Sequence, residues 1–125
     1  MKVGLLATLD AERESCLLFV YGSLKRGLAN HQELHLAEYV STALTAPYFA
    51  LRVSDGYPAL VTGSRAIVGE LYRIPESSLS GLDEFEGDRY IRREIELANG
   101  LRALAYLSRG KDDGEPYPGE EWPAR

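Results

Sequence analysis

The sequence has few of the features that would set it apart from ordinary globular proteins. It has one cysteine, Cys16, so it forms no intrachain disulfide, and a reducing compartment, by default the cytoplasm, is predicted. No apolar run approaches the roughly 18 residues of a membrane span, so no membrane association is expected. Charged residues between Asp10 and Glu14 interrupt the apolar start of the chain, and a secretory signal is therefore not predicted.

The chain also lacks an excess of positive charge. Its formal net charge is -5, and Lys25-Arg26 is the nearest approach to a basic patch. Nucleic-acid binding needs a concentrated basic surface, so nucleic acid is excluded as a partner. The length of 125 residues and the 45% apolar content suit one globular domain. We expect this domain at residues 17–108, with an N-terminal extension at 1–16 and a tail at 109–125 that is disordered or laid over the surface.

An apolar run that enters a glycine-containing loop is the most informative local pattern. Leu17 to Val20 are continuously apolar, which predicts a short strand buried on both faces. The loop Tyr21-Gly22-Ser23-Leu24 follows directly. Gly22 leaves room for a ligand beside the peptide N–H groups, so the loop is either a tight turn or a nest for a carboxylate or phosphate. Neither Gly-x-Gly-x-x-Gly nor a phosphate-loop ending is present, so no nucleotide motif is supported.

Strand patterns dominate the rest of the chain. Extended segments are predicted at 43–53, 59–61, 67–74, 91–97 and 101–107, with a bulge at Gly69 and a hairpin turn at Asn99-Gly100. One short helix is predicted from Asn30 to Val40. A second is expected to open at Pro75 and to close at Gly87, with proline at its start and glycine just past its end.

The second helix carries a carboxylate on its apolar side. At about 100° per residue, Glu86 falls between Leu79 and Leu82, whereas Glu84 points the other way. Either the helix frays before Gly87 and Glu86 is solvated, or Glu86 is buried and must be paired, protonated or functional. Burial would raise its pKa toward the range that suits a general acid or base. Asp83 is considered as a second acid, as in a paired-carboxylate glycosidase, or as a solvated or pairing group.

Other candidate chemistries have weaker patterns. Cys16 has no evident histidine partner and is predicted to be an inert thiol. His31 and His35 are four residues apart but lack an adjacent glutamate and a third ligand, so no metal site is predicted. Ser23 has no base beside it to activate its hydroxyl as a nucleophile. A hydroxyl that donates a hydrogen bond to a bound carboxylate is the favoured role for this residue.

Taken in order, these elements resemble the gamma-glutamylcyclotransferase family, most closely its short branch of gamma-glutamylamine cyclotransferases. The resemblance covers roughly residues 17–107. The residues that carry it are Tyr21-Gly22-Ser23-Leu24, Lys25-Arg26-Gly27, Asn30-His31, Leu82-Asp83-Glu84-Phe85-Glu86-Gly87 and Tyr90-x-Arg92.

The resemblance implies an α+β fold, a small mixed beta-barrel with a few packed helices, and no cofactor. It implies that Tyr21, Gly22, Ser23 and Leu24 bind the alpha-carboxylate of a gamma-glutamyl group. The catalytic glutamate of the family corresponds to Glu86, and its Tyr-x-Arg aromatic to Tyr90. Arg92 is expected to support the strand or the loop, while Asn30 and His31 match the pattern without an assigned role.

The expected function is therefore cyclotransferase chemistry on a small gamma-glutamyl amide. The substrate's alpha-amine attacks its own gamma-carbonyl, 5-oxoproline forms and an amine leaves, with Glu86 moving the proton. One alternative is a non-catalytic module of the same fold that only binds gamma-glutamyl-like carboxylates. Another is a deprotecting step that removes a gamma-glutamyl group from a biosynthetic intermediate. The identity of the leaving amine stays open at this stage.

Overall fold

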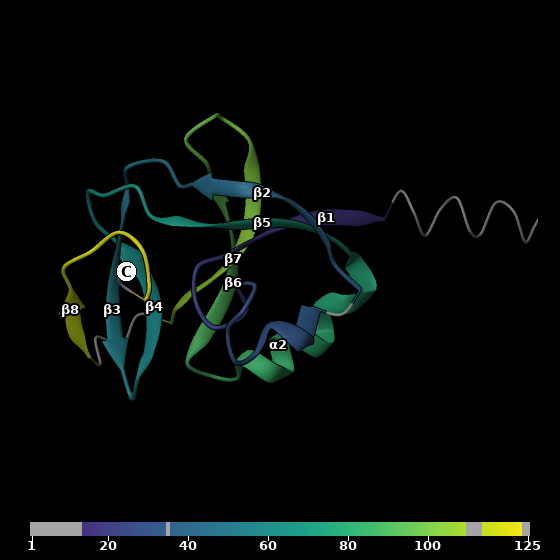
Figure 1. The fold of residues 1–125 in the computed structure, drawn as a ribbon, viewed down its shortest axis with the longest axis horizontal. Helices are drawn as coiled ribbons and strands as arrows, with labels where there is room; N and C mark the ends of the chain where they lie inside the picture. The colour runs from purple at the N-terminus through teal and green to yellow at the C-terminus, as the bar shows by residue number, and fades with distance from the viewer. Residues whose placement is uncertain (1–13, 35, 110–113, 124–125) are drawn as a thin grey trace, which may run out of the picture.

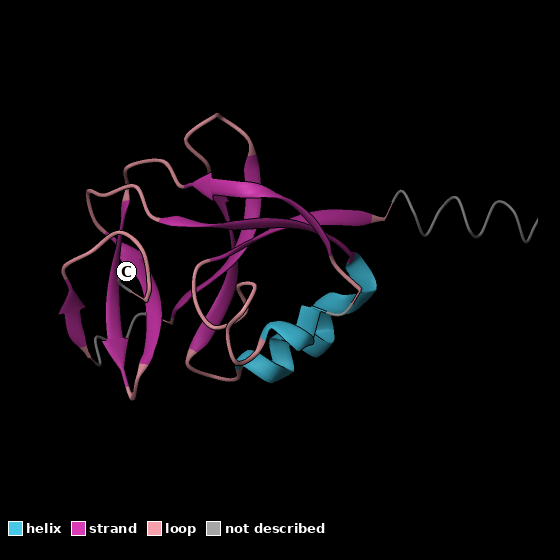
Figure 2. Ribbon diagram, viewed as in Figure 1, coloured by secondary structure: helices cyan, strands magenta, loops and turns pink. Residues whose placement is uncertain are grey.

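The computed structural model describes residues 14–34, 36–109 and 114–123. In these ranges the fold is one mixed sheet of eight strands with three short helical segments to one side of it (Figures 1 and 2). This arrangement confirms the α+β class. The strands are β1 (Ser15–Val20), β2 (Glu38–Leu44), β3 (Phe49–Ser54), β4 (Tyr57–Thr62), β5 (Val68–Pro75), β6 (Tyr90–Glu96), β7 (Arg102–Ser108) and β8 (Glu115–Tyr117). The helical segments are the 3-10 turns η1 (His31–Leu34) and η2 (Glu76–Ser78) and the α-helix α2 (Leu79–Glu86).

The sheet branches at β7 and does not close. The strand order is β2-β5-β1-β7-β4-β3-β8, with β6 paired to β7. Strands β2 and β8 stand at the two ends of this order, and no strand among the described residues joins them, so the predicted closure into a barrel is wrong. The sheet branches because both edges of β7 are occupied. One edge pairs with β6 over the full length of β7, and the other edge is shared by β1 and β4.

The shared edge of β7 creates a gap between two strands, which we call the β1–β4 split. Strand β1 lies parallel to β7 at Leu18 opposite Leu104, and β4 lies parallel to it at Leu60 opposite Leu107. Strand β1 therefore leaves the edge of β7 where β4 takes its place. The loop that follows β1 emerges at this split.

Two apolar clusters cover the two faces of β1. Its residues alternate between them, since Phe19 belongs to one cluster and Leu18 and Val20 to the other. The second cluster also contains Leu34 of η1 and Leu82 of α2, so the helical segments cover this face (Figure 2). Each large apolar side chain buried in this way contributes about 1.5–3 kcal/mol to folding. The glycine-containing loop and α2 are thereby fixed to the same face of one strand.

Residues 30–40 do not form the single helix that the sequence pattern predicts. Among the residues of this segment that the structure describes, only His31–Leu34 are helical, and β2 begins at Glu38. Strand β2 pairs antiparallel with the outer edge of β5, which would otherwise leave its backbone groups unpaired. Tyr39 and Val40 also favour strands, so pairing outweighs the helical spacing of the apolar residues here.

Gly69 permits a close backbone approach and makes no bulge. A Cβ atom at this position would lie 2.4 Å from the carbonyl oxygen of Val20 and 2.6 Å from Cζ of Phe19. The register between β5 and β2 is regular through Gly69, which lies opposite Ala43. The irregularity lies in β2 instead, between Tyr39 and Ser41, so the predicted position of the bulge is wrong.

Residues 114–123 add an end strand to the sheet and pack against one of its apolar clusters. Strand β8 pairs antiparallel with β3 (Figure 1). Tyr117 and Trp122 pack against the apolar cluster that contains Phe19. Of the two arrangements expected for the tail, residues 114–123 adopt the surface one. The extension predicted at the N-terminus falls largely outside the described residues. None of the helices in the described ranges is long and apolar enough to cross a membrane.

Candidate functional site

The loop after β1 is a tight turn that also lines a cavity. The N–H of Lys25 donates to the carbonyl oxygen of Gly22 at 3.0 Å, which closes the turn. A Cβ atom on Gly22 would lie 3.0 Å from Cγ of Pro58 in β4, so glycine is needed for close approach. Gly22, Ser23 and Leu24 line the cavity, and none of their N–H groups has a hydrogen-bond acceptor within the described residues.

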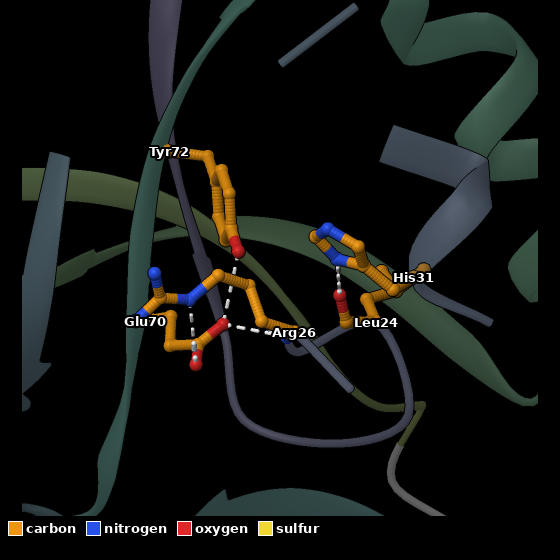
Figure 3. A network of polar contacts seen from close by, with 5 residues as sticks. All are labelled: Leu24, Arg26, His31, Glu70 and Tyr72. Carbon is orange, nitrogen blue, oxygen red and sulfur yellow. Dashed lines mark hydrogen bonds and ion pairs between the residues drawn. The ribbon is translucent and has the colours of Figure 1, made fainter. Parts of the chain in front are cut away.

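Asn30 and His31 hold the loop through hydrogen bonds and do not line the cavity themselves. The Nδ2 of Asn30 donates to Oγ of Ser23 at 2.7 Å, and its backbone N–H donates to the Ser23 carbonyl at 3.0 Å. His31 Nδ1 lies 2.9 Å from the carbonyl oxygen of Leu24, which can only accept, so this nitrogen carries the proton (Figure 3). The sequence pattern assigned no role to this pair; in the structure both residues position the loop. His35 lies outside the described residues.

Arg26 ties the far end of the loop to β5 and does not line the cavity. Its backbone N–H donates to Oε1 of Glu70 at 2.9 Å, and the same oxygen accepts from the hydroxyl of Tyr72 at 3.0 Å (Figure 3). Its guanidinium carbon stands 3.8 Å from the centre of the Tyr39 ring, a cation–π contact. The side chain of Arg26 is therefore used within the fold, as expected when the loop backbone is the binding group.

Tyr21 fills the β1–β4 split. Its hydroxyl donates to the carbonyl of Tyr106 in β7 and accepts from the N–H of Leu60 in β4 at 3.0 Å. Burial raises the pKa of Tyr21 well above its usual value, so the phenol stays protonated. Its ring lines the cavity, while its hydroxyl satisfies two backbone groups that the divergence of the strands leaves unpaired.

Glu86 is the last residue of α2 and faces the cavity. The helix stays intact to this point, because Gly87 adopts a φ of 76° and donates its N–H to the carbonyl of Asp83. Glu86 is half-buried, and desolvation raises its pKa from 4.5 to about 7. Glu84 is exposed on the other side of the helix. The buried alternative therefore holds, and the carboxyl group is set to exchange protons near neutral pH.

Asp83 is not brought into the cavity with Glu86. It accepts a hydrogen bond from the hydroxyl of Tyr106 at 2.7 Å and forms an ion pair with Nη1 of Arg92 at 3.2 Å. It lines a different hollow, which contains no residue of the loop. The contacts do not place two acids across one site. Arg92, which was expected to support the strand or the loop, pairs instead with Asp83 of α2.

Tyr90, Tyr57, Pro58 and Tyr106 complete the cavity walls. The hydroxyl of Tyr90 donates to the carbonyl oxygen of Pro58 at 2.8 Å, which joins β6 to β4 across the site. Burial and then the negative charge of Glu86 raise the pKa of Tyr90, so its phenol remains a donor. Tyr90 was expected near the site; the other three belong to no local motif and come from strands paired far along the chain.

Metal and thiol chemistry have no counterpart in this cavity. No group of three or more histidine, cysteine, aspartate or glutamate side chains suited to a metal ion occurs in the described ranges. Cys16 lies on β1 outside the cavity, and burial followed by the charge of Glu76 raises the pKa of its thiol. A thiol held protonated in this way is a poor nucleophile.

A family model agrees with the motifs described above. The model described as gamma-glutamyl cyclotransferase, AIG2-like matches residues 18–124. Gamma-glutamylaminecyclotransferase A of Danio rerio is 39% identical over 92 residues, an alignment that covers 64% of this chain and 57% of that protein. The gamma-L-glutamyl-butirosin B gamma-glutamyl cyclotransferase of Niallia circulans is 33% identical over 69 residues, with 55% of this chain and 44% of that protein covered. The chain thus spans about half the length of these relatives.

A solved structure agrees with the fold. The crystal structure of an AIG2-like protein from Mus musculus superposes with a TM-score of 0.69 at 26% identity, covering 78% of this chain and 80% of that one. The fold described above is therefore similar to one that has been observed in a crystal.

Proposed function

Because the chain belongs to the gamma-glutamyl cyclotransferase, AIG2-like family, we propose that it is an enzyme that cleaves a gamma-glutamyl amide into 5-oxoproline and a free amine or amino acid. The observation that carries the proposal is a single cavity with two complementary walls. One wall is the loop from Gly22 to Leu24 with its N–H groups, and the other holds Glu86 with its raised pKa.

The loop is proposed to bind the alpha-carboxylate of the gamma-glutamyl group. Successive backbone N–H groups in a turn suit an anion, and Ser23 adds a hydroxyl beside them. Asn30 and His31 support this role, because their hydrogen bonds fix the loop before any ligand arrives. Fixing the carboxylate leaves the gamma-carbonyl free to lie near Glu86. A substrate curled in this way has its alpha-amine close to its own gamma-carbonyl, which lowers the barrier by several kcal/mol.

Glu86 is proposed to carry one proton through the reaction. The neutral alpha-amine attacks the gamma-carbonyl carbon, and a bond forms between them. The surplus proton on that nitrogen passes to the Glu86 carboxylate. Glu86 then donates it to the leaving nitrogen as the original amide bond breaks, so the carboxylate is restored. General catalysis of this kind contributes about 10²–10⁴-fold, and a pKa of about 7 suits both the accepting and the donating step.

The direct test is release of 5-oxoproline from a panel of gamma-glutamyl amines, gamma-glutamyl amino acids and glutathione. Glu86→Gln keeps the size of the side chain and removes its titrating proton, so we expect turnover to fall at least 10²-fold while ligand affinity changes only a few-fold. Glu84→Gln is the matched control on the exposed side of the same helix and should retain activity. Failure to turn over any member of the panel would favour the binding module, and full activity of Glu86→Gln would exclude the proposed proton transfer.

The pH dependence gives a second test of the same group. Glu86 must be a carboxylate in the free enzyme to accept the first proton. We therefore expect kcat/KM to rise with pH and to level off above an ionisation near 7, because burial raises the pKa of Glu86 to about 7. A profile that is flat from pH 5 to pH 8 would argue against Glu86 as the base.

A further inference from the structure

A second hollow adjoins the cavity and shares one wall with it. Ser23, Tyr57, Glu86 and Tyr90 line both spaces. In the proposed reaction Glu86 protonates the leaving nitrogen, so this nitrogen must lie within reach of the Glu86 carboxyl group. That carboxyl group borders both the cavity and the second hollow. A gamma-glutamyl group anchored at the loop fills the cavity. The substituent on the leaving nitrogen then extends into the second hollow.

The second hollow has a cation at its edge. Arg89, on the turn between α2 and β6, lines this hollow and not the first cavity. Its Nη1 lies 3.3 Å from Oδ2 of Asp55, whose side chain is 83% exposed and does not line the hollow. An exposed ion pair of this kind is weak, so the guanidinium is free to exchange its partner.

The positive charge of Arg89 acts on Tyr90, whose side chain borders both spaces. The charge of Arg89 acts on the pKa of Tyr90 in the direction that favours the phenolate, against the larger effect of burial. Desolvation accounts for the raised pKa of Glu86. Arg89 borders the second hollow together with Glu86 and does not line the first cavity.

Two exposed aromatic rings accompany the cation. Tyr57 is 48% exposed and Phe85 is 41% exposed, and both line the second hollow. Large aromatic groups left open to water beside a polar site offer apolar contact area to a ligand. The hollow thus combines a positive charge with an apolar surface.

We propose that the second hollow binds the leaving group, and that this group is an amino acid or short peptide whose carboxylate pairs with Arg89 and whose side chain contacts Tyr57 and Phe85. The inference rests on the proposed function and names its substrate class. A leaving group with a cationic end, such as a diamine, would meet Arg89 with like charge and is disfavoured.

A pair of substrates that differ by one carboxylate tests the assignment. Gamma-glutamyl-phenylalanine and gamma-glutamyl-phenethylamide share the glutamyl group and the aromatic ring. A charge-assisted pair at a half-exposed arginine is expected to favour the phenylalanine substrate roughly tenfold in kcat/KM, measured as 5-oxoproline release. Arg89→Gln should reduce this preference to less than about threefold, and Arg89→Lys, which keeps the charge, should retain part of it.

Two further variants complete the design. Arg93→Gln removes an exposed arginine of β6 that lines neither space, so it should keep the tenfold preference. Asp55→Asn removes the acid that competes for Arg89, and asparagine accepts the φ of 54° at this position, so the preference should rise roughly two- to fivefold.

The outcomes separate this inference from the proposed function. Equal turnover of the two substrates by the wild-type protein, or an unchanged preference in Arg89→Gln, overturns the assignment of the second hollow and leaves the cyclotransferase proposal standing. Absence of 5-oxoproline from both substrates and from the wider panel overturns the proposed function and this inference with it.

Discussion

The raised pKa of Glu86 predicts a stability effect that does not depend on knowing the substrate. A carboxyl group with a pKa of about 7 in the folded chain and about 4.5 in the unfolded chain binds its proton more tightly when folded. Its stabilising contribution is therefore fully present below about pH 4.5 and is lost as the pH rises through about 7. Ionised Glu86 consequently destabilises the folded protein at alkaline pH.

The magnitude follows from the size of the shift. A rise from 4.5 to about 7 corresponds to about 3 kcal/mol at about 1.4 kcal/mol per pKa unit. Water that enters the open cavity screens the ionised group, so we expect about 1–2 kcal/mol in practice. Glu86→Gln mimics the protonated form at every pH. It should match the wild-type stability at pH 4 and exceed it by this amount at pH 8.5.

Urea unfolding at the two pH values measures the difference. With a denaturant slope of about 1–1.5 kcal/mol per molar, the Glu86→Gln midpoint should lie about 1 M higher at pH 8.5 and close to the wild-type midpoint at pH 4. Glu84→Gln removes the same charge from the exposed side of α2 and should change stability by less than about 0.5 kcal/mol at either pH. A variant that is no more stable than wild type at pH 8.5, or an equal difference at both pH values, would refute the argument that Glu86 is desolvated.

Three further substitutions test how the site is supported. Tyr21→Phe leaves two buried backbone groups without a partner and should lower the free energy of unfolding by about 2 kcal/mol, measured by urea denaturation. Gly69→Ala forces a Cβ atom to within 2.4 Å of the Val20 carbonyl oxygen and should cost at least about 2 kcal/mol; a neutral result in the same assay would show that the strands can separate. Asn30→Ala removes a hydrogen bond to Ser23 and should raise KM roughly tenfold at unchanged thermal stability, because it loosens the loop and not the core.

The parts of the site that the sequence predicts are those encoded by short stretches of chain. The loop is predicted by the apolar run of β1 and by Gly22, which follows this run after Tyr21. Helical periodicity places Glu86 on the apolar side of α2, and Gly87 marks the end of that helix. These signals are local, since they depend on spacings of a few residues, and the structure bears out the buried position of Glu86.

The remaining walls depend on strand pairing, which leaves no mark in a short window of sequence. Pro58 and Tyr106 join the cavity because β4 and β7 meet at the β1–β4 split. The helix predicted between Asn30 and Val40 fails for a related reason, since the free edge of β5 recruits the second half of that segment as a strand. The roles of Asn30 and His31 likewise require knowledge of how the loop folds back upon itself.

The separation along the chain of the groups that meet at the site has a consequence for folding. Tyr21 reaches its hydrogen-bond partners across 85 and 39 residues, and Tyr90 reaches Pro58 across 32. Contacts between residues so far apart in the sequence form late in folding. Each of them requires a long loop of chain to close, and the entropy cost of closure precedes any stabilisation from the contact. A refolding chain is therefore expected to recover helical signal from α2 well before it recovers ligand binding, and the return of binding becomes a reporter of the last strand to dock.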